Sequence, residues 1–324
     1  MKKKMFMMLC LTIMGIQVMM AQQSIIALHH EGKVTIFAGS KTQEAMDASV
    51  KGDTLYLSEG TFAGWNVTHG IVVLGSGERS VVSGNITITG NDENKDLGGY
   101  VFSGLNLLHD FVVNDSVNGL RLSQCNMNTF EVKDNAIIDG AEIVMCYFRS
   151  FFSVGGSEDD ITVLSSKINI VSYGGNKKGS VSFNHCNITV AQDGDSESQY
   201  RNTYLNCIIM YANCSTFLRS IYSRTGYYPN HFDGGREPDL QDGCVKAEFS
   251  FDEKLNCSLP DDTLKARGYL GDDGTVVGIT GGECPFTLEL ATPHIVDHKV
   301  DVDNVNRKLT VTLKMAHEAT KEDE

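Results

Sequence analysis

Apolar and polar positions recur at a nearly constant interval through the middle of the chain. A small or apolar residue marks each repeat, and successive marks are 21, 20, 21, 20, 20 and 21 residues apart. The marks are Gly84, Leu105, Cys125, Cys146, Ser166, Cys186 and Cys207. Apolar residues follow each mark by two positions: Ile86, Leu107, Met127, Phe148, Ile168, Ile188 and Ile209. Apolar or aromatic residues also precede each mark by three positions: Val81, Phe102, Leu122, Ile143, Val163, Phe183 and Tyr204.

The offsets of these columns predict two short strands per repeat with a corner between them. Residues on one face of a strand are two positions apart, so a mark and the residue two after it can share a face. The residue three before the mark can join them only if the backbone bends in between. The two positions before each mark hold residue types that tolerate turns or left-handed backbone geometry, such as Gly104, Asn184 and Asn206.

Stacked coils of about 20 residues explain this period, because one such unit cannot bury its apolar face without neighbours above and below. A leucine-rich repeat is the alternative. It needs regularly spaced leucines and a helical segment in each repeat, whereas these units are rich in Val, Ile, Thr, Phe and Asn and have no helical period. The pattern therefore predicts an all-β fold, a parallel β-helix.

The ends of the chain predict caps and an export signal. Residues 1–21 combine three lysines, an apolar stretch and a final Ala21, as in a secretory signal peptide. We expect the protein to be exported and then secreted, periplasmic or associated with the cell surface. The apolar stretch is short and interrupted, and no second one follows, so we expect no integral membrane segment after cleavage.

Four regions are predicted: the signal peptide 1–21, an N-terminal cap 22–52, the β-helix 53–290, and a C-terminal β segment with a tail, 291–324. In the cap, Ser40 and Gln43 have the spacing of a capping box at the start of a short helix. Alternating polarity around an Asn-rich turn predicts a hairpin or edge strand in 299–315. Polar insertions predict loops at Asn91–Gly99, Gly155–Asp160, Tyr173–Gly179 and Gln192–Ser198.

Charge narrows the choice of partner. The whole chain has a formal net charge of −14, which becomes −17 when residues 1–21 and their three lysines are removed. Such a chain lacks the basic surface that phosphates require, so we expect no nucleic acid partner. The same charge weighs against an anionic polysaccharide.

Eight cysteines remain after the predicted cleavage, in a compartment where disulfides are possible. The four at the marks would stack at about 4.8 Å, but parallel side chains fit disulfide torsions badly, so we expect packed thiols. The pairing of Cys214, Cys244, Cys257 and Cys284 stays open. The cysteine and histidine spacings match no zinc site, and we predict no metal and no cofactor.

Three segments resemble known β-helix proteins. AMDASVKGDTLYLSEGTFAG resembles the opening of bacterial right-handed parallel β-helix proteins of the pectate-lyase-like superfamily, and LNCIIMYANCS resembles their Asn-Cys coils. LKARGYLGDDGTVVGITGGECPFTLELATPHI resembles the closing segment of a secreted β-helix group common in Bacteroidetes. The resemblance covers most of residues 38–315. It implies a right-handed coil and a group whose members mostly have no assigned activity.

The superfamily includes polysaccharide lyases, polygalacturonases and pectin esterases, so their catalytic patterns can be sought here. Asp159 and Asp160 supply the acidic pair of a polygalacturonase, but its other elements do not occur in order, which favours an acidic turn. A lyase needs a basic residue beside calcium-binding carboxylates, and residues 193–198 have neither a Gly at the sixth position nor the distal Glu of a calcium loop. His109 and His185 have no carboxylate or serine at a suggestive offset. We predict no catalytic residue.

The stretch from Arg219 to Arg236 is the best candidate for ligand binding. Its aromatic and hydrogen-bonding side chains suit a platform for sugar rings. The candidate residues are Arg219, Tyr222, Arg224, Tyr227, Tyr228 and His231. The alternative is a cap loop whose tyrosines cover the last coil, because an aromatic ring with a polar tip also suits half-buried positions.

These observations favour an exported, non-catalytic β-helix that binds a partner at a surface. The expected partner is a polysaccharide, an oligosaccharide or a component of the cell envelope. A polysaccharide lyase or glycoside hydrolase with a divergent active site is the alternative. A purely structural envelope or adhesin component is a third possibility, and it differs from the first in having no small-ligand site.

Overall fold

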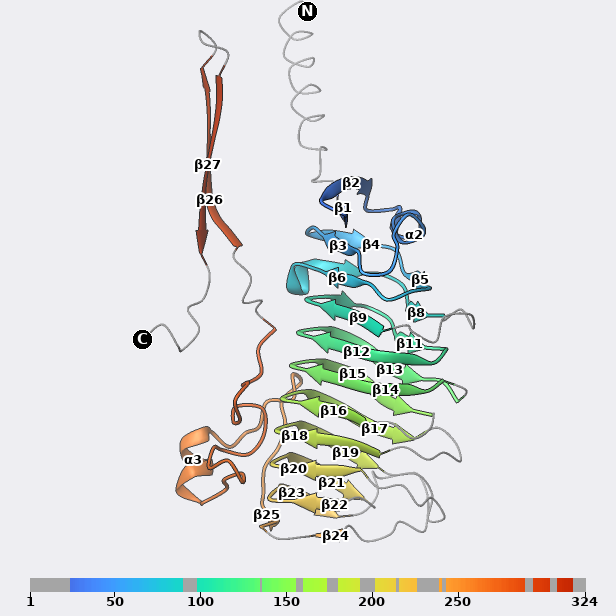
Figure 1. The fold of residues 1–324 in the computed structure, drawn as a ribbon. Coiled ribbons are helices and arrows are strands. Elements are labelled where there is room, and N and C mark those ends of the chain that lie inside the picture. The colour runs from blue at the N-terminus through green and yellow to red at the C-terminus, as the bar shows by residue number, and fades with distance from the viewer. Residues whose placement is uncertain are drawn as a thin grey trace, which may run out of the picture. The chain divides into compact units, whose positions relative to one another are not determined.

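A computed structural model describes residues 24–89, 98–134, 136–155, 160–173, 180–192, 202–213, 216–225, 239–240, 243–288, 294–303 and 308–316. Two compact units divide the chain, residues 1–288 and 289–324. The first is a parallel β-helix, as the period predicted (Figure 1). Each coil contributes strands to two sheets, here called sheet A and sheet B.

Sheet A begins in an N-terminal hairpin and continues through parallel neighbours from β3 to β24. In spatial order it contains β2 (Lys33–Ala38), β1 (Ile25–His30), β3 (Thr54–Leu57), β6 (Val72–Leu74), β9 (Gly98–Ser103), β12 (Val117–Ser123), β14 (Ile138–Val144), β16 (Asp160–Leu164), β18 (Ser180–Asn184), β20 (Thr203–Leu205), β22 (Thr216–Leu218) and β24 (Asp239–Leu240).

Sheet B is parallel throughout and follows the other side of the coil. Its main path contains β25 (Val245–Lys246), β23 (Ile221–Thr225), β21 (Ile208–Asn213), β19 (Asn187–Gln192), β17 (Lys167–Tyr173), β15 (Tyr147–Val154), β13 (Asn126–Val132), β10 (Asn106–Leu107), β7 (Ser80–Val82) and β4 (Gly60–Phe62). Three more strands pair beside this path: β5 (Trp65–Val67), β8 (Ile86–Ile88) and β11 (Phe111–Val113).

The predicted columns are confirmed from Leu105 onward. Phe183 pairs with Val163 on one side and Tyr204 on the other, and Ile188 likewise lies between Ile168 and Ile209. All six of these side chains are buried. The stacked columns of the sequence are therefore the core of the coil.

The alignment of the first repeat at Gly84 was wrong. Phe102 pairs with Val73 rather than with Val81, and Leu107 pairs with Val82 rather than with Ile86. The 3₁₀ turn η1 (Gly77–Arg79) lies inside this coil. It lengthens the corner and displaces the strand of sheet B, so a fixed offset from Gly84 selects the wrong residues.

Left-handed residues form the predicted corners between the two sheets. The six corners from Leu105 onward have one residue with positive φ directly before the mark: Gly104, Gln124, Met145, Ser165, His185 and Asn206. Arg219, directly before Ser220, has the same conformation in the next coil. Met145 and Arg219 were not among the expected turn formers. The corners therefore share one backbone conformation although their residues differ. The stacking of successive corners sets that conformation, and the intrinsic preference of each residue type does not.

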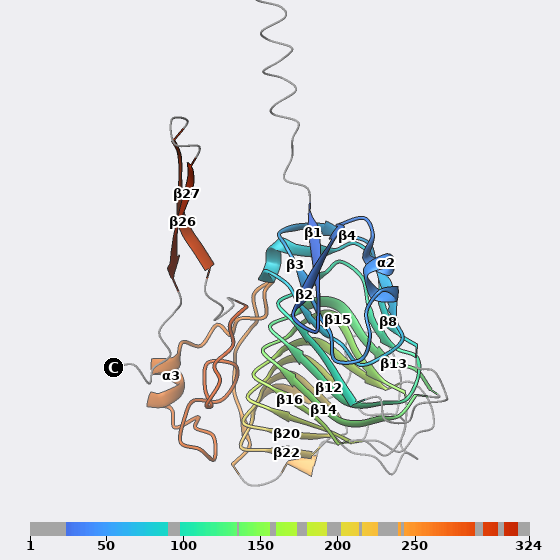
Figure 2. The same cartoon turned by 45° about the horizontal axis from the view of Figure 1, so that its top comes forward.

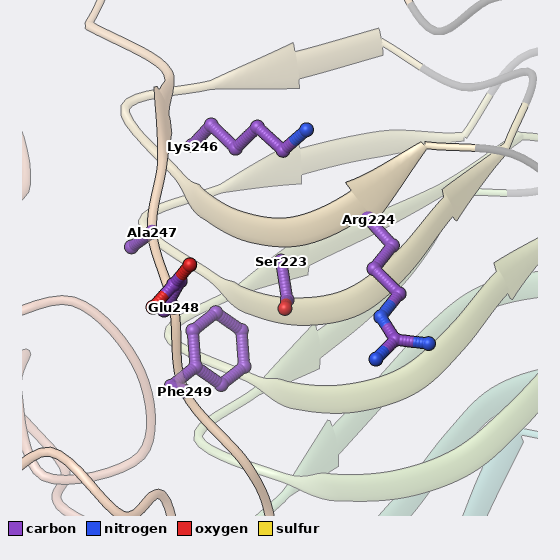
Figure 3. Close-up of a pocket in the computed structure, with 6 residues that line it drawn as sticks. All are labelled: Ser223, Arg224, Lys246, Ala247, Glu248 and Phe249. Atoms are coloured by element: carbon purple, nitrogen blue, oxygen red, sulfur yellow. The ribbon is translucent and has the colours of Figure 1, made fainter.

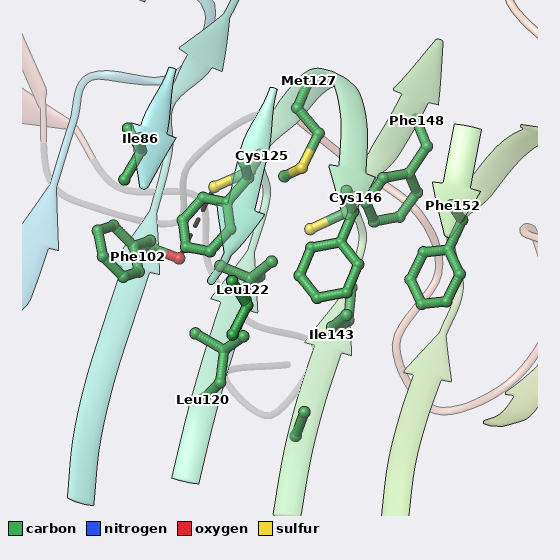
Figure 4. Close-up of a cluster of buried hydrophobic side chains, with 14 of the residues drawn as sticks. Ile86, Phe102, Leu120, Leu122, Cys125, Met127, Ile143, Cys146, Phe148 and Phe152 are labelled. Atoms are coloured by element: carbon green, nitrogen blue, oxygen red, sulfur yellow. Dashed lines mark hydrogen bonds between the residues drawn. The ribbon is translucent and has the colours of Figure 1, made fainter. Parts of the chain in front are cut away.

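Aromatic side chains stack through the centre of the coil. Neighbouring ring centroids are 4.8–6.1 Å apart along a continuous series. The series is Phe102, Phe111, Phe130, Phe152, Phe183, Tyr204 and Phe217. Figure 4 shows Phe102 and Phe152 of this series in the core, with Phe148 next to Phe152 and with Cys125 and Cys146 beside the rings.

The four cysteines at the marks are buried free thiols, as predicted. Cys125 Sγ donates to the Ser123 carbonyl oxygen at 3.2 Å and to the Phe102 carbonyl oxygen at 3.7 Å, the second of which Figure 4 marks. Burial raises the pKa of the Cys146 and Cys207 thiols well above the usual value. Cys244, Cys257 and Cys284 are free as well, whereas Cys214 lies outside the described residues.

The cap at the N-terminal end consists of the β1–β2 hairpin and helix α2 (Thr42–Asp47), which Figure 2 shows over the end of the coil. The predicted helix is present, but the capping box was wrong. Lys41 takes the N-cap position without a side-chain hydrogen bond. The amide of Gln43 instead exchanges hydrogen bonds with the backbone of Asn66, which ties the helix to β5.

Residues 247–288, here called the closing segment, run back along the side of the last coils and include helix α3 (Asp261–Ala266) (Figure 1). A second apolar cluster joins this segment to sheet B: Ile208, Ile221, Ala247, Leu264, Val276 and Val277. The unit 289–324 contains an antiparallel hairpin of β26 (His294–Asp303) and β27 (Lys308–Ala316), as the alternating pattern predicted. Most of the predicted loop residues lie outside the described ranges.

Candidate functional site

A hollow of about 660 Å³ opens on the outer side of the last coils (Figure 3). Its lining consists of Ser223, Arg224, Lys246, Ala247, Glu248 and Phe249. Ser223 and Arg224 belong to β23, Lys246 is the last residue of β25, and Ala247, Glu248 and Phe249 follow it along the chain. The volume is within the range of about 300–1,000 Å³ that is typical of small-ligand sites.

Strand pairing holds the two walls of this hollow together. Tyr222 in β23 pairs with Lys246 in β25, and the Ala247 N–H donates to the Tyr222 carbonyl at 2.9 Å. Arg224 pairs with Tyr211 in β21. Since neighbouring strands fix the backbone on both sides, the lining residues project from a rigid scaffold.

The polar side chains of the hollow carry both signs of charge. Arg224, Lys246 and Glu248 are exposed, and none of them forms an ion pair with another described residue. The Arg224 guanidinium lies 5.7 Å from the centre of the Tyr211 ring, which limits its orientation. Phe249 is half-buried and adds an apolar wall, with its ring 5.6 Å from that of Phe251.

Of the three predicted ligand-binding residues that the structure describes, Arg219, Tyr222 and Arg224, only Arg224 lines the hollow. Arg219 lies at the preceding corner with a φ of 44° and is exposed. Tyr222 continues the buried column of Ile188 and Ile209 and packs against the core. Tyr227, Tyr228 and His231 lie outside the described residues. Sequence reasoning missed Lys246, Glu248 and Phe249, because their segment has no recognisable motif.

A second polar cluster joins a corner of the coil to the closing segment. His185 Nε2 is 3.1 Å from Asp273 Oδ2, and His185 Nδ1 is 3.2 Å from the Gly278 carbonyl oxygen. Asn206 Nδ2 donates to Asp272 Oδ1 at 2.6 Å and to Asn184 Oδ1 at 3.0 Å. The sequence did not reveal a carboxylate partner for His185, because Asp273 is 88 residues away.

This cluster holds the segment in place. The His185 side chain is only 5% exposed, and glycines in the closing segment pack directly against it. A Cβ on Gly282 would be 2.9 Å from the imidazole, and one on Gly281 would be 1.7 Å from the Val276 carbonyl oxygen. The repeated glycines of VGITGG therefore permit a close approach of backbone to the corner.

Lys167 makes a further contact to the same segment. Its ammonium donates to Asn256 Oδ1 at 2.7 Å and lies 4.5 Å from the centre of the Phe286 ring. Burial lowers the pKa of Lys167, although the nearby carboxylate of Asp252 opposes that shift. Since the amine has two partners in a packed contact, it acts as an anchor for the segment.

The other candidate sites offer fewer groups for binding or catalysis. A second hollow of about 420 Å³ is lined by ends of sheet B strands and contains the Glu131–Lys133 ion pair at 2.6 Å. Asp160 begins β16 and pairs with Ser180, whereas Asp159 is outside the described ranges. His109 is exposed. Within the described part of the chain, the acidic, histidine and cysteine side chains form no group of three suited to a metal ion.

Comparisons of the chain with protein-family models, with curated proteins and with solved structures give no match. The class that the structure defines is a parallel β-solenoid with coils of about 20 residues. The helices of the described residues are all too short or too polar to cross a membrane.

Proposed function

We propose that this protein is an exported, non-catalytic binding module of the pectate-lyase-like superfamily and that its ligand is an oligosaccharide. The hollow formed by Ser223, Arg224, Lys246 and Glu248 with Phe249 carries this proposal. It is the larger of the two hollows described above, and three of its charged side chains are exposed and without an ion-pair partner in the described chain.

The lining suits the two kinds of surface that a sugar presents. The Ser223 hydroxyl, the guanidinium of Arg224 and the ammonium of Lys246 can donate hydrogen bonds to sugar oxygens, and Glu248 can accept them from hydroxyls. The Phe249 ring offers an apolar surface for the C–H face of a pyranose. A neutral sugar matches this mixed lining better than an anionic one, given the overall negative charge of the chain.

The superfamily assignment is supported by the segments that resemble it. The motif GDDGTVVGITGG forms the part of the closing segment that packs on His185 and Asn206, and the GDTLYL segment forms β3 at the start of the parallel ladder. Residues 1–21 support export.

A glycan array probed with the purified protein tests the proposal. Titration of the best oligosaccharide should then show weaker binding by Arg224→Ala and Phe249→Ala, by about fivefold or more each, since one contact contributes about 1 kcal/mol. Arg219→Ala is the matched control, because Arg219 is exposed nearby but does not line the hollow. Absence of any glycan ligand, or equal losses in all three variants, would contradict the proposal.

Activity assays on the polysaccharides that bind distinguish a binding module from an enzyme. Reducing-end and unsaturated-product assays on each bound polysaccharide should remain at the background level. Cleavage by the parent protein that is abolished by Asp159→Asn or Asp160→Asn would establish a polysaccharide-degrading enzyme instead.

A further inference from the structure

Strand β2 is the outer edge of sheet A at the N-terminal end of the coil (Figures 1 and 2). It pairs with β1 on one side, and no other described strand pairs with it. The register with β1 is unbroken from Ile25↔Ala38 to His30↔Lys33. β2 is therefore regular and without a bulge along its whole length.

The turn between β1 and β2 determines which backbone groups of β2 are free. Glu31 and Gly32 have φ values of 46° and 77°, so the two-residue turn has the positive angles of type I′. Such a turn is closed by a hydrogen-bonded pair, here His30 and Lys33. Because these pairs alternate along an antiparallel ladder, the N–H and C=O groups of Val34 and Ile36 point away from β1.

The side chains at this edge are apolar and exposed. Val34 is 53% exposed and Ile36 is 57% exposed. The register places them on the face that also holds Ile25 in β1 and Tyr56 in β3, which are 42% and 43% exposed. Natural edge strands are usually protected by charges, proline or bulges. β2 has only Lys33, at its first position.

We propose that β2 pairs with β2 of a second copy of this chain across a twofold axis. An antiparallel edge is complementary to itself, so one strand supplies both sides of the interface. With Thr35 on the axis, Val34 of each copy lies opposite Ile36 of the other. Their outward N–H and C=O groups then form four interchain hydrogen bonds, and the apolar side chains continue one surface across the junction.

The charges on β2 permit a second copy as the occupant. β2 contains no carboxylate, so two chains with a large negative charge can meet at this strand without opposing acids on it. In the proposed register, Lys33 lies opposite Phe37 of the other copy rather than opposite the same lysine. The hollow beside β23 and β25 lies at the opposite end of the coil from β2 (Figure 1). In the dimer, the copies of this hollow would therefore lie at the two distal ends.

Sedimentation velocity of the purified protein over a wide concentration range tests this pairing. We expect a reversible monomer–dimer equilibrium, with a dissociation constant raised at least tenfold by Ile36→Lys. The matched control is Leu108→Lys, because Leu108 is 48% exposed and lies away from β2. A parent protein that stays monomeric at every concentration, or a dimer that Ile36→Lys leaves unchanged, would overturn the proposal.

A crosslinking experiment tests the register even if Ile36→Lys disturbs the cap. In a Cys284→Ser background, Thr35→Cys should form a disulfide between copies on mild oxidation. Facing residues on the axis are about 4.5 Å apart between Cα atoms, which suits a disulfide. Lys33→Cys in the same background should not crosslink, because the two introduced thiols would lie four residues apart in register. Equal crosslinking by both variants would refute this register.

Discussion

Replacing Phe183 with alanine tests the stacked core. The Phe183 side chain is 1% exposed and belongs to the aromatic series in the centre of the coil. Its ring stacks on Tyr204 at 4.8 Å with an interplanar angle of 5°, and it meets the edge of Phe152 at 5.5 Å and 73°. The substitution removes both ring contacts and leaves a cavity between two coils.

The expected loss of unfolding free energy is about 4 kcal/mol. Burial of a phenylalanine side chain contributes about 2–3 kcal/mol, and each aromatic pair adds about 0.5–1.5 kcal/mol. The sum agrees with the range of about 3–5 kcal/mol for Phe→Ala in protein cores. Ser182 precedes Phe183 on the opposite face of β18 and is exposed, so Ser182→Ala should change stability by less than about 0.5 kcal/mol.

Urea unfolding followed by circular dichroism and by tryptophan fluorescence measures both variants. The single tryptophan, Trp65, is buried near the N-terminal end, so the two signals also show whether the coil unfolds in one step. A loss below about 1 kcal/mol for Phe183→Ala, or an equal loss for Ser182→Ala, would refute the assignment of inward and outward columns.

Two further predictions concern thiols and pH. In the folded, unreduced protein, a thiol reagent should label Cys284 rapidly and the four buried cysteines at the marks only after unfolding; disulfides between neighbouring coils would contradict this. Burial alone would raise the pKa of Asp273, but hydrogen bonds from Thr275 and the nearby His185 outweigh it and lower the pKa. A lowered pKa stabilises docking of the closing segment above the unfolded value of about 4, and this contribution is lost as pH falls through the folded value. Limited proteolysis of the segment should therefore accelerate below about pH 4 in the parent and show a weaker pH dependence in Asp273→Asn; identical pH profiles would contradict this role for Asp273.

Most of the coil could be predicted from sequence because its repeat is local and regular. From Leu105 to Ile209, a constant offset selects buried residues, since each coil meets only its neighbours above and below. The prediction failed at Gly84 because η1 lengthens one corner. It also failed at Ser40 because Lys41 takes the N-cap position and the amide of Gln43 bonds to Asn66.

The candidate site was harder to predict, because strand pairing between distant residues creates it. Arg224 was identified among aromatic and basic neighbours, but Phe249 joins it only through the pairing of β23 with β25. In the same way, Asp273 reaches His185 only when the closing segment returns along the coil. A repeat period specifies neighbours one coil away, and it carries no information about a segment outside the repeat.

The most direct test of the proposed function is a crystal structure of the protein with the oligosaccharide that binds most tightly on the array. The account predicts that the sugar occupies the hollow, with its hydroxyls hydrogen-bonded to Arg224 and Glu248 and one ring against Phe249. A sugar bound at another surface, with the hollow empty, would contradict it.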